Sequence, residues 1–148
     1  MIASTAERVS SNTSQRVNAR IWQQTQAKMR RVAAAGRPAI ERRLRELDEE
    51  WDIERYVETM APTFTLLGLT LGLTRNRRFL LIPFVVQAFF LQHALQGWCP
   101  PIPVLRELGV RTQGEIEQER YAIKALRGDF RHVKGQGSTS QALAASEH

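Results

Sequence analysis

Two long runs without a charged side chain, joined by a short arginine-rich segment, constrain this chain more than any other feature of its sequence. The first run covers residues 59–74 and holds 16 residues, and the second covers residues 79–105 and holds 27. The sequence RNRR separates them. A membrane-spanning helix needs about 20 mostly apolar residues. The second run satisfies that length, and the first approaches it when Tyr56 and Val57 extend its apolar surface by a turn.

The two runs predict two helices joined at the arginines, which either cross a membrane or form the buried core of a soluble domain. Both runs are apolar most of the way round and lack the polar stripe of a surface helix. The rest of the 148-residue chain has few apolar segments that could cover two such helices. We therefore favour a transmembrane helical hairpin over residues 59–105.

The average composition does not reveal this segregation. A hydrophobic share of 43% and a net charge of +6 are typical of a soluble basic protein. Outside the hairpin the charges nearly balance, with 11 basic and 9 acidic residues before it and 7 basic and 6 acidic residues after it. Basic residues interleaved with acids do not form a nucleic-acid-binding patch, so we expect no nucleic-acid partner. A single cysteine excludes an internal disulfide framework and a Cys-based zinc site.

The N-terminal region, residues 1–58, is expected to form amphipathic and charged helices. Five residues recur at helical spacing with arginines around them: Val17, Ile21, Thr25, Met29 and Val32. Such a helix either lies on an anionic membrane surface or packs on its neighbours. Pro38 is well placed to start a second helix. The apolar face of that helix is predicted to hold Ile40, Leu44, Leu47 and Trp51.

Three prolines after the second run, Pro100, Pro101 and Pro103, are expected to break helical structure. Residues 106–133 then predict a short helical segment whose apolar face carries Ile116, Ile123 and Leu126. Residues 134–148 have a disordered composition. The predicted fold class is therefore all-α: a transmembrane hairpin with amphipathic N-terminal helices and a short C-terminal helix.

The second run ends in a distinctive motif, Gly97-Trp98-Cys99-Pro100, which is followed by Leu108-Gly109-Val110 and Thr112. A hairpin with this exit resembles the YgaP-like inner-membrane transmembrane domain, a small bacterial family of uncharacterised function. The resemblance covers residues 53–112 and implies a location in the bacterial inner (cell) membrane. Some relatives carry a sulfurtransferase domain before the hairpin. This chain carries none, so the resemblance implies no catalytic activity.

Cys99 is the candidate functional thiol. A sulfur-carrier role needs a partly exposed thiol whose thiolate is stabilised by positive charge, which Arg106 could supply if the chain folds back. The other interpretation is a structural corner, in which Gly97 allows the turn, Trp98 anchors at the interface and the prolines end the helix. We favour the structural corner.

Two further sets of residues in the hairpin are candidates for helix packing. Gln92, His93 and Gln96 share one helical face and are expected to point toward the first helix or a second copy of the chain. Gly68 and Gly72 form a G-x-x-x-G spacing, which permits close packing either within the hairpin or in a dimer. His93 and Cys99 point in different directions, so we expect no metal site, and we expect no cofactor.

No catalytic motif occurs in the sequence, so we expect a non-enzymatic membrane protein that anchors, scaffolds or interacts with other proteins. The expected partners are the lipid bilayer and either a second copy or other membrane proteins. A thiol-dependent sulfur-carrier or redox role of Cys99 is the alternative. Seven arginines flank the hairpin and three lie in its turn, which favours cytoplasmic termini. The flanking arginines are Arg42, Arg43, Arg45, Arg55, Arg106, Arg111 and Arg120.

Overall fold

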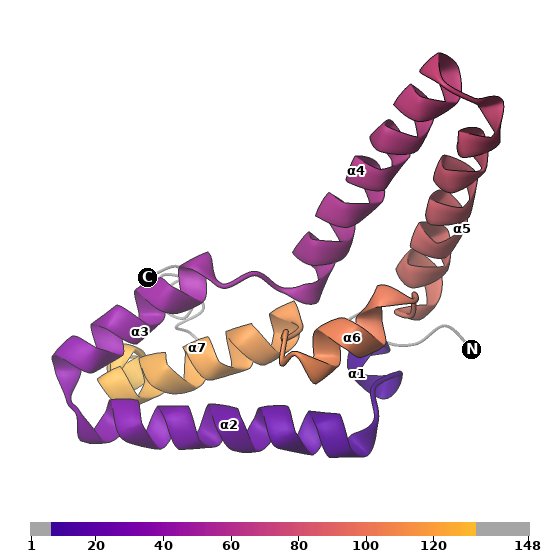
Figure 1. Ribbon diagram of the computed structural model, residues 1–148. Coiled ribbons are helices and arrows are strands. Elements are labelled where there is room, and N and C mark those ends of the chain that lie inside the picture. The colour runs from indigo at the N-terminus through magenta and orange to yellow at the C-terminus, as the bar shows by residue number, and fades with distance from the viewer. Residues whose placement is uncertain (1–6, 133–148) are drawn as a thin grey trace. The chain divides into compact units, whose positions relative to one another are not determined.

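The computed structural model describes residues 7–132, which form helices and no strand, so the all-α prediction is confirmed (Figure 1). The tail predicted to be disordered, residues 134–148, lies outside the described residues. The chain divides into two compact units, which we describe separately. One unit holds the residues up to Ile21 and Trp51–Gly114, and the other holds Trp22–Glu50 and the residues from Glu115 onward.

The first unit is built on a helical hairpin of α4 (Ile53–Thr74) and α5 (Leu81–Gln96), joined through the 3-10 helix η1 (Arg77–Leu80). The two long helices lie side by side in Figure 1. The carboxylate of Asp52 accepts a hydrogen bond of 2.7 Å from the Arg55 N–H, so α4 begins before the charge-free run. The expected boundary at residue 59 therefore falls inside α4.

Glycines in α4 let the two helices of the hairpin approach closely. A Cβ added at Gly68 would lie 2.5 Å from Cδ of Pro83, and one added at Gly72 would lie 2.4 Å from Cδ2 of Leu80. Both contacts are with the second half of the hairpin. Of the two packing arrangements that the G-x-x-x-G spacing left open, the structure shows the one within the hairpin.

The base of the hairpin contacts two short helices that the sequence did not predict, α1 (Arg8–Ser11) and α6 (Pro101–Glu107). It belongs to one unit with these helices and with the first part of the predicted N-terminal helix, α2 (Gln15–Ala34). The prolines were expected to break helical structure, but Pro101 is the first residue of α6. A proline is tolerated there because the first turn of a helix needs no intrahelical N–H donors. The apolar core of this unit consists of Val9, Ile53, Val57, Cys99 and Ile102.

The second unit contains the rest of α2, with α3 (Arg37–Glu49), α7 (Gln113–Arg127, from Glu115 onward) and the 3-10 helix η2 (Asp129–His132). Its core consists of Ile40, Leu44, Leu47, Ile116 and Ile123, with Met29 and Val32 packed against it. The predicted faces of α3 and α7 thus meet. Trp51 does not join that face because α3 ends at Glu49, and Leu126 is exposed.

The apolar stripe predicted for the N-terminal helix faces the protein in the described structure. Val17 and Ile21 of α2 are buried in the first unit, and Met29 and Val32 pack in the second. The sequence left open whether this stripe lies on a membrane surface or packs on neighbouring helices. The contacts that the structure describes are with neighbouring helices. Trp22 lies off the stripe and is exposed.

A buried ion pair joins α3 to α7 in the second unit. The Arg43 guanidinium donates to both carboxylate oxygens of Glu119, over 2.8 and 3.0 Å, and both side chains are nearly inaccessible to solvent. Burial alone would lower the pKa of Arg43, but the hydrogen bonds and charge of Glu119 outweigh it and raise that pKa. Glu50, directly after α3, also pairs with Arg43, and Asp48 of α3 pairs with Arg120 of α7.

Candidate functional site

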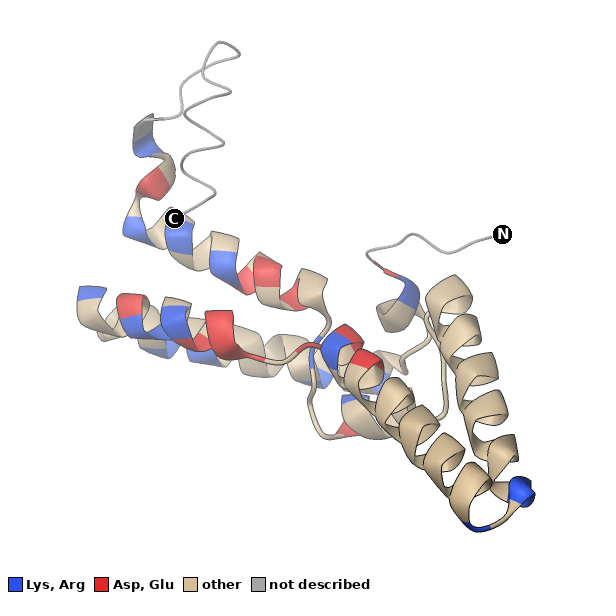
Figure 2. Ribbon diagram, turned by 90° about the horizontal axis from the view of Figure 1, so that it is seen from above, with Lys and Arg blue, Asp and Glu red and all other residues tan. Residues whose placement is uncertain are grey.

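The outer surface of the hairpin carries large apolar side chains. Leu66 and Leu73 of α4 are 65% and 81% exposed, and Leu81 and Phe84 of α5 are 66% and 74% exposed. Soluble monomers rarely expose contiguous apolar patches of more than a few hundred Å². Figure 2 shows the hairpin without Lys, Arg, Asp or Glu between its two ends.

Among the described residues, one helical stretch, Arg77–Gln96, is long and apolar enough to cross a membrane. Only 11% of its most apolar window is buried. The sequence analysis expected two such helices. α4 has 22 residues, but Glu54, Arg55 and Glu58 occupy its first turns and reduce its apolar length. By length and composition, therefore, one helix of the hairpin meets the requirement.

Aromatic residues gather at the base of the hairpin. The rings of Trp51 and Tyr56 lie 5.2 Å apart, and the Arg55 guanidinium sits 4.5 Å from the centre of the Trp51 ring. Trp98 is partly exposed just beyond α5. Tyrosine and tryptophan are enriched at membrane–water interfaces, because one end of each side chain is apolar and the other polar.

The opposite end of the hairpin, which we call the arginine tip, consists of Arg75, Asn76, Arg77 and Arg78. All four residues are exposed. The Asn76 side chain accepts a hydrogen bond of 2.9 Å from the Arg78 N–H and so shapes the turn. No acidic residue occurs between Thr59 and Leu105, and no ion pair joins the three arginines to any carboxylate that the structure describes.

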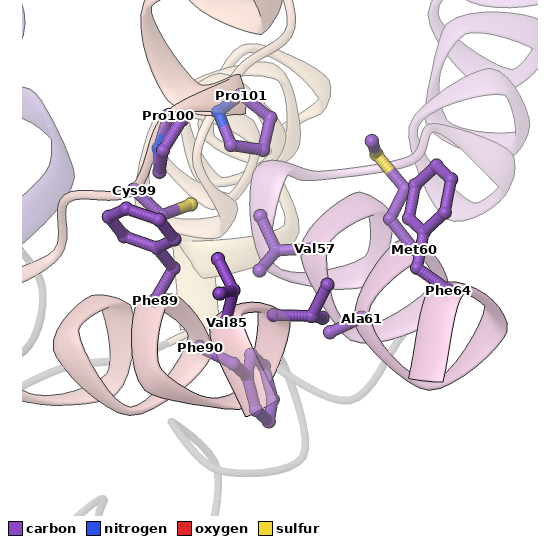
Figure 3. A pocket seen from close by; sticks show the side chains of 11 residues that line it. Val57, Met60, Ala61, Phe64, Val85, Phe89, Phe90, Cys99, Pro100 and Pro101 are labelled. Carbon is purple, nitrogen blue, oxygen red and sulfur yellow. The ribbon is translucent and has the colours of Figure 1, made fainter. Parts of the chain in front are cut away.

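An apolar cavity of about 190 Å³ lies between α4 and α5 near the base of the hairpin, with Cys99 in its wall (Figure 3). Val57, Ala61 and Phe64 line it from α4, and Val85 and Phe89 line it from α5. Pro100 and Pro101 close it beside the thiol. Cavities lined in this way hold apolar groups or stay dry.

The environment of Cys99 disfavours a thiolate. The residue is 2% exposed and lies in the apolar core of the first unit, beyond the C-terminal end of α5. Burial raises the pKa of the Cys99 thiol, and the Ile102 N–H only partly offsets this effect. Arg106, expected to supply charge if the chain folds back, donates instead to the Val110 carbonyl over 3.1 Å and to Oδ1 of Asn18 over 2.7 Å.

Gly97 makes the corner that places Cys99. It follows the last residue of α5 with φ of +71°, a left-handed conformation that favours glycine. A Cβ at this position would also meet the carbonyl group of Arg8 at 2.5 Å. The structure thus places Gly97, Trp98, Cys99 and Pro100 in a turn between α5 and α6, which is the geometry of a structural corner.

The three polar residues of α5 that were expected to share one face, Gln92, His93 and Gln96, differ in their burial. His93 is buried, with no hydrogen-bond partner at Nδ1 among the described groups. Gln96 is exposed, and its backbone carbonyl oxygen accepts a hydrogen bond of 2.8 Å from the Asn12 side-chain amide. Gln92 is partly exposed. The polar contact between α4 and α5 comes from Gln87, whose amide donates to the Thr65 hydroxyl over 2.8 Å. The sequence analysis did not identify this pair.

In the part of the chain that the structure describes, no group of three or more His, Cys, Asp or Glu side chains could hold a metal ion. Comparisons with protein-family models, with curated proteins and with solved structures find no match.

Proposed function

We propose that this protein is a non-enzymatic membrane component whose hairpin α4–α5 inserts into a lipid bilayer, and whose helical units outside the bilayer anchor or scaffold other proteins. The observation that carries the proposal is the outward-facing apolar surface of the hairpin. A core helix of a soluble domain buries its apolar side chains, whereas 11% of the most apolar window of Arg77–Gln96 is buried.

The dimensions and ends of the hairpin support insertion. The 20 residues of Arg77–Gln96 rise by about 30 Å, close to the hydrocarbon thickness of a bilayer. α4 reaches a similar length because it starts before its charge-free run, so that its charged first turns would lie at the interface beside Trp51 and Tyr56. Pro62 lies inside α4, where a membrane helix tolerates proline better than a soluble helix does.

The resemblance to the YgaP-like family is part of this proposal, since it implies an inner-membrane location for a hairpin with the same exit motif. The alternative role, sulfur or redox handling through Cys99, is less well supported. That role needs an accessible thiol of low pKa. Cys99 is buried, and its pKa is raised.

Lysine substitutions on the outer surface of the hairpin test the proposal. We expect the wild type to remain in the membrane pellet after extraction with alkaline carbonate. L66K/F84K places two charges on the exposed face, each costing about 2.5–3.5 kcal/mol at the bilayer centre, and is expected to lose membrane retention. L126K changes an exposed leucine of α7 in the same way and is the matched control, expected to stay in the pellet.

Recovery of the wild type as a monodisperse protein without detergent would contradict the proposal. Retention of L66K/F84K at the wild-type level would also contradict it, because the substituted face would then not contact lipid.

A further inference from the structure

We propose that the arginine tip is a binding site for the phosphate groups of anionic phospholipids, at the membrane face that the tip reaches. The inference deepens the proposed function and rests on insertion of the hairpin. Its starting point is a contrast between arginines of the same unit. Arg8 lies 3.9 Å from Glu54, and Arg16 and Arg20 each pair with Glu107 over 2.9 Å.

Among residues 7–132, the three arginines of the tip have no such partner. Arg75, Arg77 and Arg78 are exposed, and the 46 residues from Met60 to Leu105 contain no acid that could neutralise them. Figure 2 shows the tip as the blue end of the hairpin, whose other charged residues lie in the first turns of α4. The hairpin therefore concentrates three positive charges at one end, where no described carboxylate pairs with them.

The position of the arginine tip in the proposed membrane orientation indicates which anions lie next to its three arginines. An arginine at the bilayer centre costs about 2.5–3.5 kcal/mol, so the tip does not rest in the hydrocarbon. The helical stretch Arg77–Gln96 rises by about 30 Å, so that the arginines at its start lie at the opposite headgroup layer when its other end lies at the aromatic base of the hairpin. The anions that line this layer are phosphodiesters.

The chemistry of the side chains matches this ligand. A guanidinium offers a planar fork of N–H donors that binds two oxygens of one phosphate. The Asn76 side chain accepts a hydrogen bond from the Arg78 N–H within the turn, and the side chains of the three arginines are exposed and accessible to a phosphate. Each arginine near an anionic membrane surface strengthens binding by about fivefold.

Lipid titration of the purified full-length protein in detergent, followed by native mass spectrometry, tests the site. The probes are phosphatidylglycerol, phosphatidylcholine and inorganic phosphate. We expect the wild type to bind phosphatidylglycerol more tightly than phosphatidylcholine. R75Q/R77Q/R78Q is expected to lower the affinity for phosphatidylglycerol on the order of a hundredfold. Its affinity for phosphatidylcholine should fall less, because the choline group balances the phosphate charge of that lipid. Added salt should weaken the wild-type preference.

A matched triple variant separates the site from net charge. R30Q/R31Q/R45Q removes three exposed arginines from α2 and α3 and is expected to keep the preference for phosphatidylglycerol. Equal affinities of wild type and R75Q/R77Q/R78Q for phosphatidylglycerol would overturn the inference. Equal loss in the two triple variants would overturn it too. Displacement of the lipid by inorganic phosphate at equal concentration would show that free phosphate is the ligand, and would overturn the assignment to lipid.

The same samples distinguish this inference from the proposed function. If the wild type resists carbonate extraction but shows no preference for phosphatidylglycerol, the hairpin inserts and only the lipid site is wrong. If the wild type is recovered without detergent, insertion itself is wrong and the lipid site is lost with it.

Discussion

Arg8 donates a hydrogen bond of 3.0 Å from Nη1 to the carbonyl oxygen of Ala94, 86 residues further along the chain. Asn12 donates to the carbonyl oxygen of Gln96 over 2.8 Å. Both carbonyls belong to the last turn of α5, where no intrahelical N–H reaches them. A positive charge is also favourable at a helix C-terminus. The short helix α1 and the residue after it therefore cap the second helix of the hairpin.

We expect Arg8→Ala to lower the stability of the protein by about 1–2 kcal/mol, because it removes a charged cap from α5. Thermal unfolding in detergent, followed by circular dichroism, measures this loss. Arg42→Ala removes an arginine that lies 4.0 Å from Glu46 on an exposed surface, and is expected to change stability by less than about 0.5 kcal/mol. Equal effects of the two substitutions would refute the capping role.

Gly68→Ala is expected to destabilise the hairpin, although the same change in an open helix stabilises by about 1 kcal/mol. The reason is the 2.5 Å approach of the added Cβ to the rigid ring of Pro83, since overpacking costs about 1–3 kcal/mol. Gly72→Ala should cost less, because its nearest atoms belong to the flexible side chain of Leu80. Thermal unfolding in detergent ranks the two variants.

The two glycine variants also separate the packing arrangements that the sequence left open. Because both glycines contact the second half of the hairpin, we expect the variants to keep the oligomeric state of the wild type in size-exclusion chromatography with light scattering. A change of oligomeric state without loss of thermal stability would instead place the glycines in a dimer contact.

The sequence predicted the elements whose signals are local. Two charge-free runs are sufficient to predict two helices, and the 4-3 spacing of Ile40, Leu44 and Leu47 is sufficient to predict a buried face. The start of α4 was predicted too late, because the cap at Asp52 lies among charged residues. α6 was missed because prolines were interpreted as helix breakers, although the first turn of a helix tolerates them.

The contacts that shape the candidate site could not be predicted from the sequence, because they join distant residues. Nothing local to Arg8 indicates that it reaches Ala94, and the G-x-x-x-G spacing does not name its partner. The environment of Cys99 depends on α1, α4 and α6 together, so its burial required the three-dimensional structure. The sequence singled out Cys99 but did not indicate that its side chain is buried.

We expect Cys99 to react slowly with iodoacetamide in the folded protein, because only the thiolate reacts and burial raises the pKa of this thiol. The rate should rise with pH only above the usual range of a cysteine. The fold stabilises the protonated thiol, so this contribution to stability is present below the unfolded pKa and is lost as pH rises through the raised folded pKa. Mass spectrometry of the alkylated protein measures the rate at each pH.

Denatured protein provides the control for Cys99, since its exposed thiol should react quickly at the ordinary cysteine pKa. Fast labelling of the native protein at neutral pH would support the sulfur or redox role instead. Cys99→Ser should leave cellular persulfide levels unchanged if the residue is a structural corner.

Glu119→Gln is expected to destabilise the second unit by about 1–3 kcal/mol, because it removes the buried carboxylate that accepts two hydrogen bonds from Arg43, while Glu46 and Glu50 still pair with the guanidinium. R43M/E119L removes both charges and should recover much of the loss, since apolar side chains of similar volume can replace a buried pair. Urea unfolding of the three proteins measures these differences. A double variant that is less stable than Glu119→Gln would show that the pair contributes more than mutual neutralisation.

For the proposed membrane insertion, the arginines of the chain predict an orientation, because seven of them flank the hairpin and three lie in the tip. We expect cytoplasmic termini and a tip on the other side of the membrane. In a Cys99→Ala background, Thr74→Cys places one exposed thiol beside the tip, and Ala27→Cys places one on α2. A membrane-impermeant maleimide should label Thr74→Cys in intact cells and Ala27→Cys only after lysis. The reverse pattern would place the arginine tip in the cytoplasm, and labelling of both positions in intact cells would show that the hairpin does not separate them across a membrane.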